Sequence, residues 1–117
     1  MEQVVLYHNP RWGKSRSVVA LLKEKKIPYS VIEYLKKGIS KETVLILAKK
    51  LNKDPIDFIR KGDLDFKKRV LAKDMLDNSK MAEFIEKYPK VLERPIVVKG
   101  QRAIIGRPPE NILKLFN

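Results

Sequence analysis

Short apolar runs typical of strands lie near both ends of the chain, and a helical period dominates between them. Residues 3–7 form a β-branched run that ends at His-Asn-Pro, and residues 29–35 carry a second run centred on Val31 and Ile32. Between these runs, residues 14–26 place valines and leucines at helical spacing with charges on the other side, which predicts an amphipathic helix. A strand-helix-strand connection of this length predicts two parallel strands.

The middle of the chain has a helical pattern that is interrupted by proline and glycine. Ser40 is placed to cap a helix that runs to about Leu51 with one apolar face. Shorter helices are predicted over residues 54–60, 67–73 and 79–88. We therefore expect a helical insertion over about residues 38–90.

The pattern changes again near the end of the chain. Residues 96–99 and 102–105 are short apolar strands, and a two-residue loop that begins with Gly100 predicts an antiparallel hairpin with a type II′ turn. A last helix is predicted over residues 110–116, after a Pro-Pro pair. The complete order predicts an α/β, thioredoxin-like fold: a four-stranded mixed sheet with a helical insertion, in one domain over residues 1–117. A flavodoxin-like fold needs more parallel strands.

Basic residues outnumber acidic ones, because 26 Lys and Arg stand against 14 Asp and Glu and give a formal charge of +12. Such a charge attracts nucleic acid, acidic proteins or small oxyanions through long-range electrostatics. Many of the lysines occur in pairs on predicted solvent faces, and neither a recognition helix nor an aromatic stacking motif is evident. We therefore do not expect nucleic-acid binding.

The chain contains no cysteine and one histidine. The lack of cysteine excludes disulfides, thiolate metal ligands and thiol nucleophiles within this sequence. A single histidine leaves a zinc site without its usual ligands, so we expect neither a metal nor a cofactor. No apolar stretch approaches the ~20 residues that span a bilayer, and the first residues lack a basic leader, so we expect a cytoplasmic protein without membrane contact.

Residues 7–16, with the sequence YHNPRWGKSR, join the first strand to the first helix. Free N–H groups and the positive end of the helix dipole suit such a junction to an oxyanion, and Lys14 and Arg16 add charge. The Gly-Lys-Ser sequence in this loop also invites comparison with a nucleotide-binding P-loop. However, His8 stands where that loop needs a glycine, and no clear magnesium-binding aspartate follows a later strand. We do not predict nucleotide hydrolysis.

The sequence resembles glutaredoxin-dependent arsenate reductases, which share their architecture with Spx-like transcriptional regulators. The resemblance covers nearly the whole chain and is carried by YHNPRWGKSR, a helical insertion that contains Arg60, ERPIVV at residues 93–98 and GRPPENIL at residues 106–113. In such enzymes a thiolate in the loop attacks arsenate that is bound by arginines, and glutathione and glutaredoxin reduce the resulting adduct.

Carried over position by position, the resemblance places Trp12 where those enzymes have the nucleophilic cysteine. An indole offers an N–H donor and no nucleophile, so no catalytic residue remains intact. The resemblance also implies an active-site loop with His8, Ser15 and Arg16, a cis peptide bond before Pro95, and oxyanion binding by Arg60, Arg94 and Arg107.

Three functions follow from this resemblance as alternatives. The first is an arsenate-reductase-like protein without thiol chemistry that retains binding of a small oxyanion such as arsenate, phosphate or sulfate. The second is an Spx-like regulator whose protein partner is RNA polymerase. The third is an active reductase with glutaredoxin as partner, which holds if Trp12 is not the natural residue.

Overall fold

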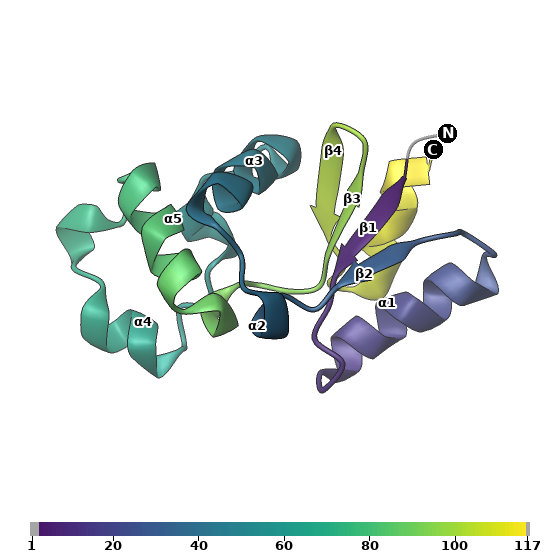
Figure 1. The fold of residues 1–117 in the computed structure, drawn as a ribbon, viewed down its shortest axis with the longest axis horizontal. Helices are drawn as coiled ribbons and strands as arrows, with labels where there is room; N and C mark the ends of the chain where they lie inside the picture. Colours follow the sequence, from purple (N-terminus) through teal and green to yellow (C-terminus); the bar gives the residue numbers. More distant parts are fainter. Residues whose placement is uncertain (1–2, 117) are drawn as a thin grey trace. The chain divides into compact units, whose positions relative to one another are not determined.

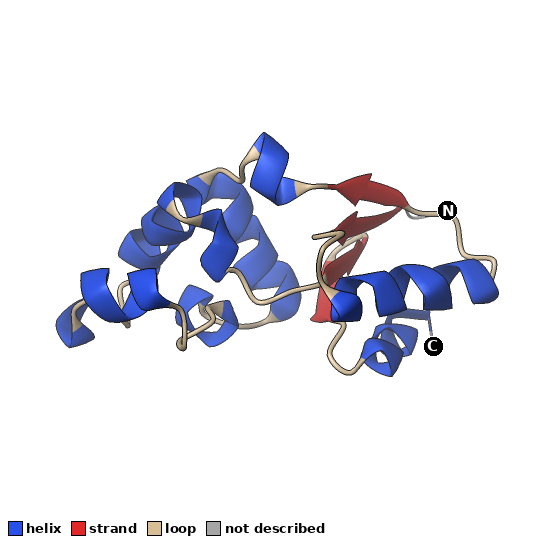
Figure 2. Cartoon of the chain, turned by 90° about the horizontal axis from the view of Figure 1, so that it is seen from below, coloured by secondary structure: helices blue, strands red, loops and turns tan. Residues whose placement is uncertain are grey.

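The computed structural model describes residues 3–116 of the chain. The chain forms two compact units: a sheet unit, made of Met1–Lys37 and Arg94–Asn117, and a helical unit, Gly38–Glu93 (Figure 1). Figure 2 shows that the strands belong to the sheet unit, whereas the helical unit consists of helices and loops. Within residues 3–116, no helix combines the length and the apolar character needed to cross a membrane.

The described part of the sheet unit has four strands: β1 (Val4–Tyr7), β2 (Ser30–Ile32), β3 (Ile96–Lys99) and β4 (Arg102–Ile105). They lie in the order β2-β1-β3-β4; β1 is parallel to β2 and antiparallel to β3, and β3 is antiparallel to β4. The predicted mixed sheet, parallel pair and hairpin are therefore confirmed. Gly100 has a φ of +60°, which the turn between β3 and β4 requires.

The second strand is shorter than predicted. β1 and β2 pair as far as Tyr7 and Ile32, and the backbone N–H of His8 then donates to the carbonyl of Ile32 at 3.0 Å. Because β1 ends there, the chain leaves the sheet and Tyr34–Lys37 forms the short helix α2. The prediction of strand structure for residues 34 and 35 is therefore wrong.

One face of the sheet is covered by the helix α1 (Gly13–Glu24) and the 3-10 helix η4 (Pro109–Phe116). Their contact forms the core of the sheet unit, which comprises Val4, Leu6, Val18, Leu22, Val97, Ile112 and Leu115. α1 ends two residues before the predicted limit because Lys26 adopts a left-handed conformation with φ of 57°. The N–H of Ile27 then donates to the carbonyl of Leu22 at 3.0 Å and closes the helix end.

The helical unit contains α3 (Lys41–Leu51), η1 (Pro55–Phe58), α4 (Leu64–Arg69), η2 (Ala72–Asp74), α5 (Asn78–Lys87) and η3 (Pro89–Val91). α3 packs against α5. The predicted cap of α3 is confirmed, because the hydroxyl of Ser40 accepts from the N–H of Thr43 at 3.1 Å.

Two boundaries in the helical unit differ from the prediction. The helix expected over residues 67–73 is α4, which begins earlier because the carboxylate of Asp63 caps its start by accepting from the N–H of Asp65 at 2.8 Å. The helix expected over residues 54–60 is the shorter η1. Ile59 is extended instead and forms a bridge with Leu92, so the chain stops being helical before Arg60.

Gly106 packs so closely against the core of the sheet unit that a side chain does not fit there. A Cβ at this position would lie 2.7 Å from Cγ2 of Val18 and 3.2 Å from Cγ2 of Ile112. We expect Gly106→Ala to lower the free energy of unfolding by about 2 kcal/mol, because overpacking a core is destabilising. Urea unfolding measures this loss, with Gly62→Ala as control, since a Cβ at Gly62 meets nothing within 4 Å. Equal stability of Gly106→Ala and the unaltered protein contradicts this packing.

Candidate functional site

The loop between β1 and α1 is fixed by Asn9, which is only 4% exposed. Its side-chain oxygen accepts from the N–H of Arg11 and its carbonyl accepts from the N–H of Trp12, each at 3.1 Å. Its own N–H donates to the hydroxyl of Ser15 at 3.2 Å, and Ser15 is completely buried. Ser15, a predicted loop residue, therefore ties the first turn of α1 to the preceding turn and sets the path of the backbone at Trp12.

Trp12 is the N-cap residue of α1, and its side chain makes no capping hydrogen bond. Its backbone is extended, with φ of −100° and ψ of 129°, and its carbonyl accepts from the N–H of Arg16 at 3.1 Å. The guanidinium of Arg16 reaches back and donates to the carbonyl of Pro10 at 3.1 Å. Trp12 therefore lies at the positive end of the helix dipole. The exposed side chain of Arg16 stabilises the loop that holds it.

Arg94 stacks on the ring of Trp12. The Cζ atom of its guanidinium lies 3.7 Å from the ring centroid, which is a close cation–π contact. Arg94 is 4% exposed, whereas Trp12 keeps 38% of its surface exposed. The N–H groups of a guanidinium point outward in its plane. The Trp12 ring, which contacts the face of the Arg94 guanidinium, therefore does not block the hydrogen bonds that its N–H groups can donate.

Arg94 and Arg107 lie beyond the open end of the hairpin, two residues from Ile96 and Ile105 respectively. β3 and β4 pair Ile96 with Ile105, and the N–H of Gly106 then donates to the carbonyl of Pro95 at 2.8 Å. Arg94 and Arg107 lie just beyond this hydrogen bond, each in a bend outside the strands. Both arginines precede a cis proline, since the Arg94-Pro95 and Arg107-Pro108 bonds are cis. The cis bond predicted before Pro95 is confirmed.

His8 follows β1 directly and is half-buried. Burial lowers the pKa of His8 below its ordinary value of 6.5, the nearby charge of Glu33 raises it, and that of Arg16 lowers it again. The buried Nδ1 atom has no hydrogen-bond partner among residues 3–116. His8 is therefore a neutral side chain at neutral pH.

We expect the free energy of unfolding to fall as the pH drops below about 6.5. Below that pH the unfolded chain binds a proton at His8, whereas the folded chain does not, because folding lowers the pKa of His8. The free energy of unfolding therefore falls until the pH is below the pKa of His8 in the folded protein. Denaturant unfolding at pH 7.5 and 5.5 measures the difference in the free energy of unfolding. This difference should be smaller in His8→Asn. A nuclear magnetic resonance titration that places the pKa of His8 above 6.5 in the folded protein contradicts this expectation.

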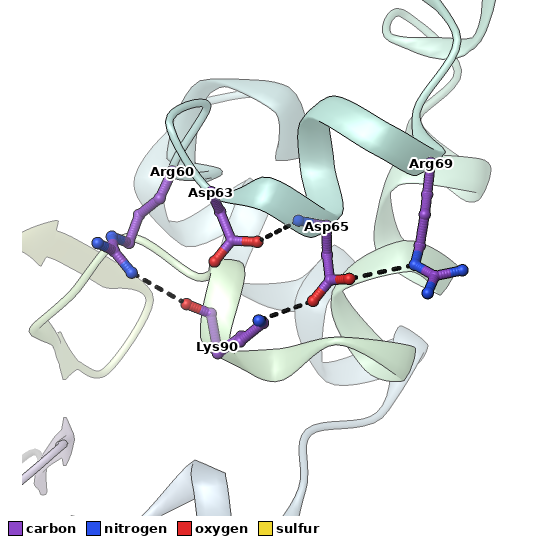
Figure 3. A network of polar contacts seen from close by, with 5 residues as sticks. All are labelled: Arg60, Asp63, Asp65, Arg69 and Lys90. Atoms are coloured by element: carbon purple, nitrogen blue, oxygen red, sulfur yellow. Dashed lines mark hydrogen bonds and ion pairs between the residues drawn. The ribbon is translucent and has the colours of Figure 1, made fainter.

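Arg60 lies in the helical unit, where its N–H donates to the carbonyl of Val91 at 2.7 Å. Figure 3 shows its guanidinium reaching the carbonyl of Lys90, at 3.5 Å. The ammonium of Lys90 pairs with Asp65 at 2.7 Å, and Asp65 also pairs with Arg69 at 3.2 Å. These hydrogen bonds, from Lys90 first and Arg69 second, hold the pKa of Asp65 below its usual value.

The predicted set of oxyanion-binding arginines contains residues of both units. Arg94 and Arg107 both belong to the sheet unit, each two residues from the end of a hairpin strand. Arg60 belongs to the helical unit. The inclusion of Arg60 in one site with the other two arginines stays a prediction.

Comparison with known proteins decides the family, since the sequence model of the ArsC family matches residues 7–115. The chain belongs to the ArsC family. It is 37% identical to an arsenate reductase of Haemophilus influenzae, over 97% of this chain and 98% of that relative. It is 36% identical to the uncharacterized protein YfgD of Escherichia coli, over 97% of each chain.

The solved structure of an arsenate reductase from Vibrio cholerae resembles this ArsC family chain, with a TM-score of 0.85 and 34% identity over 97% of both chains. The thioredoxin-like α/β fold that the sequence predicted is therefore confirmed.

Two features of this ArsC family chain were missed in the sequence. One is Asn9, whose three hydrogen bonds shape the loop; its position between the first strand and Pro10 is a turn signal that could have revealed it. The other is the second cis bond, at Arg107-Pro108. The Pro-Pro pair indicated only the start of the last helix, and nothing else in the sequence marks this bond.

Proposed function

We propose that this ArsC family protein binds a small tetrahedral oxyanion such as arsenate, phosphate or sulfate and does not reduce it by thiol chemistry. The observation that carries the proposal is the position of Arg94. The guanidinium lies against the ring of Trp12 at the start of α1, and Arg107 lies two residues after Ile105 in the neighbouring strand of the same hairpin. The site thus combines two forked cations with a helix N-terminus, and an indole occupies the position that the family resemblance assigns to the nucleophile.

The charges of the sheet unit favour an anionic ligand. This unit has thirteen Lys and Arg against four Asp and Glu, which gives +9 of the total +12. An oxyanion that accepts hydrogen bonds from Arg94 and Arg107 has several oxygens, which match the forked donors of both guanidinium groups.

The chemistry of Trp12 argues against thiol-dependent turnover. Reduction of arsenate in the enzymes that this sequence resembles begins with attack by a thiolate, and the chain contains no cysteine. The indole of Trp12 donates one hydrogen bond and cannot form a thiol-arsenate adduct. The protein therefore acts as a binding protein that keeps the fold and the arginines of the family.

Isothermal titration calorimetry of the unaltered protein tests this proposal. We expect saturable binding of arsenate, phosphate and sulfate with one site per chain, and much weaker binding of nitrate, which has one negative charge and a planar shape. Affinity should fall with rising salt, because the ligand and the site are charged. Absence of saturable binding for all three tetrahedral anions at low salt contradicts the proposed function.

A further inference from the structure

Trp12 is the one tryptophan of the chain, and 38% of it is exposed although a buried cation covers part of its ring. A bare oxyanion that is held by the arginines has no use for an exposed aromatic surface beside it. We infer that the exposed part of the Trp12 ring binds a flat aromatic group that is attached to the oxyanion, so that the site takes aryl or heteroaryl esters of phosphate or sulfate. This inference rests on the proposed oxyanion site.

The stack between Arg94 and Trp12 brings the two halves of such a ligand together. The Cζ atom of the guanidinium lies 3.7 Å from the centroid of the indole ring, and the N–H donors of the group lie along its edge, where an oxyanion would accept hydrogen bonds. The anion and the indole are therefore neighbours of the same side chain. A ligand whose ring is bonded to the oxyanion through one oxygen can contact the indole while its charged end contacts the edge of Arg94.

Stacking on the indole suits an aromatic group because it needs no hydrogen bond. Aromatic rings gain from offset or edge-to-face contacts in addition to the apolar area that they bury, and stacking on aromatic side chains tolerates many ring types. Arg94 also contacts one face of the Trp12 ring and restricts its motion. Arg94 is 4% exposed, and the Trp12 backbone is fixed by its hydrogen bond to Asn9, so little conformational freedom is lost when a ring binds.

Two esters with the same charged group test the inference: phenyl phosphate, which carries a ring, and methyl phosphate, which does not. Calorimetry on the unaltered protein should show that phenyl phosphate binds about tenfold more tightly, which corresponds to about 1.4 kcal/mol. The fluorescence of Trp12 should change more with phenyl phosphate than with methyl phosphate. In Trp12→Leu, which keeps an apolar side chain beside Arg94, the two affinities should become equal, whereas Trp12→Phe should keep most of the difference.

The outcomes separate this inference from the proposed function. If inorganic phosphate and both esters bind equally well, or if Trp12→Leu retains the preference for phenyl phosphate, the aromatic subsite does not exist and the oxyanion site stands. If none of the three binds, both proposals fail. Arg102→Ala serves as the matched control, because it removes one positive charge at the turn end of β4 and should leave the preference for phenyl phosphate unchanged.

Discussion

Trp12→Cys is expected to give the protein a reactive thiol and arsenate reductase activity, which we propose the unaltered chain does not have. The new sulfur would stand at the N-cap position of α1, where the helix dipole favours negative charge, and next to the guanidinium of Arg94. Both effects lower the pKa of the thiol well below its ordinary value of about 8.5. Alkylation rates as a function of pH give this pKa, and arsenite formed with glutathione and glutaredoxin gives the activity.

Trp12→Ser is the matched control for this gain. Serine is nearly the same size as cysteine, and its hydroxyl oxygen is not nucleophilic at neutral pH. Trp12→Ser should therefore form no arsenite. A thiol in Trp12→Cys that titrates near 8.5, together with no turnover, would show that the site has diverged beyond the loss of one residue.

Arg94→Ala is expected to weaken arsenate binding by about 30-fold or more, or about 2 kcal/mol, because truncation at a buried charge-assisted contact is costly. Arg94 is 4% exposed and is held by the ring of Trp12, so its donors are already oriented before the ligand arrives. Arg94→Lys keeps the charge and loses the planar fork, and we expect it to recover only part of the affinity. Calorimetric titration with arsenate measures both changes.

Arg102→Ala controls for the loss of charge. Arg102 is exposed at the turn end of β4, and its guanidinium donates to the carbonyl of Lys114 at 3.2 Å, whereas Arg94 lies beyond the open end of the hairpin. The control should bind arsenate within about threefold of the unaltered protein. If Arg94→Ala, folded as judged by its thermal unfolding, binds arsenate as tightly as the control, then Arg94 is not an oxyanion ligand.

The sheet of this protein was predictable because its strands are marked by local signals. β3 and β4 have the predicted bounds, since two apolar runs flank a glycine that the turn requires. The length of β2 depends on where its partner β1 ends, and the pattern of apolar and polar residues in β2 does not show this point. The strand predicted there is therefore too long. α4 was misplaced because a side chain, that of Asp63, sets its start, while the run of basic residues that follows suggests a later one.

For the candidate site, the sequence names residues but does not give the contacts between them. The loop sequence and the two Arg-Pro pairs pointed to Trp12, Arg94 and Arg107 through their resemblance to a known family. The stack of Arg94 on Trp12 depends on how the end of the hairpin meets the loop before α1, more than 80 residues apart in sequence. No local pattern encodes such a contact, because it arises from tertiary packing.

We propose that this fold keeps an arginine-lined anion site and holds an indole at the position where the family resemblance places a nucleophilic cysteine. Arsenite production by the unaltered protein, with Trp12 verified by peptide mass spectrometry, is the decisive measurement. In the presence of arsenate, glutathione and glutaredoxin, we expect no arsenite above the background without the protein. Arsenite that accumulates in proportion to the protein concentration would contradict it.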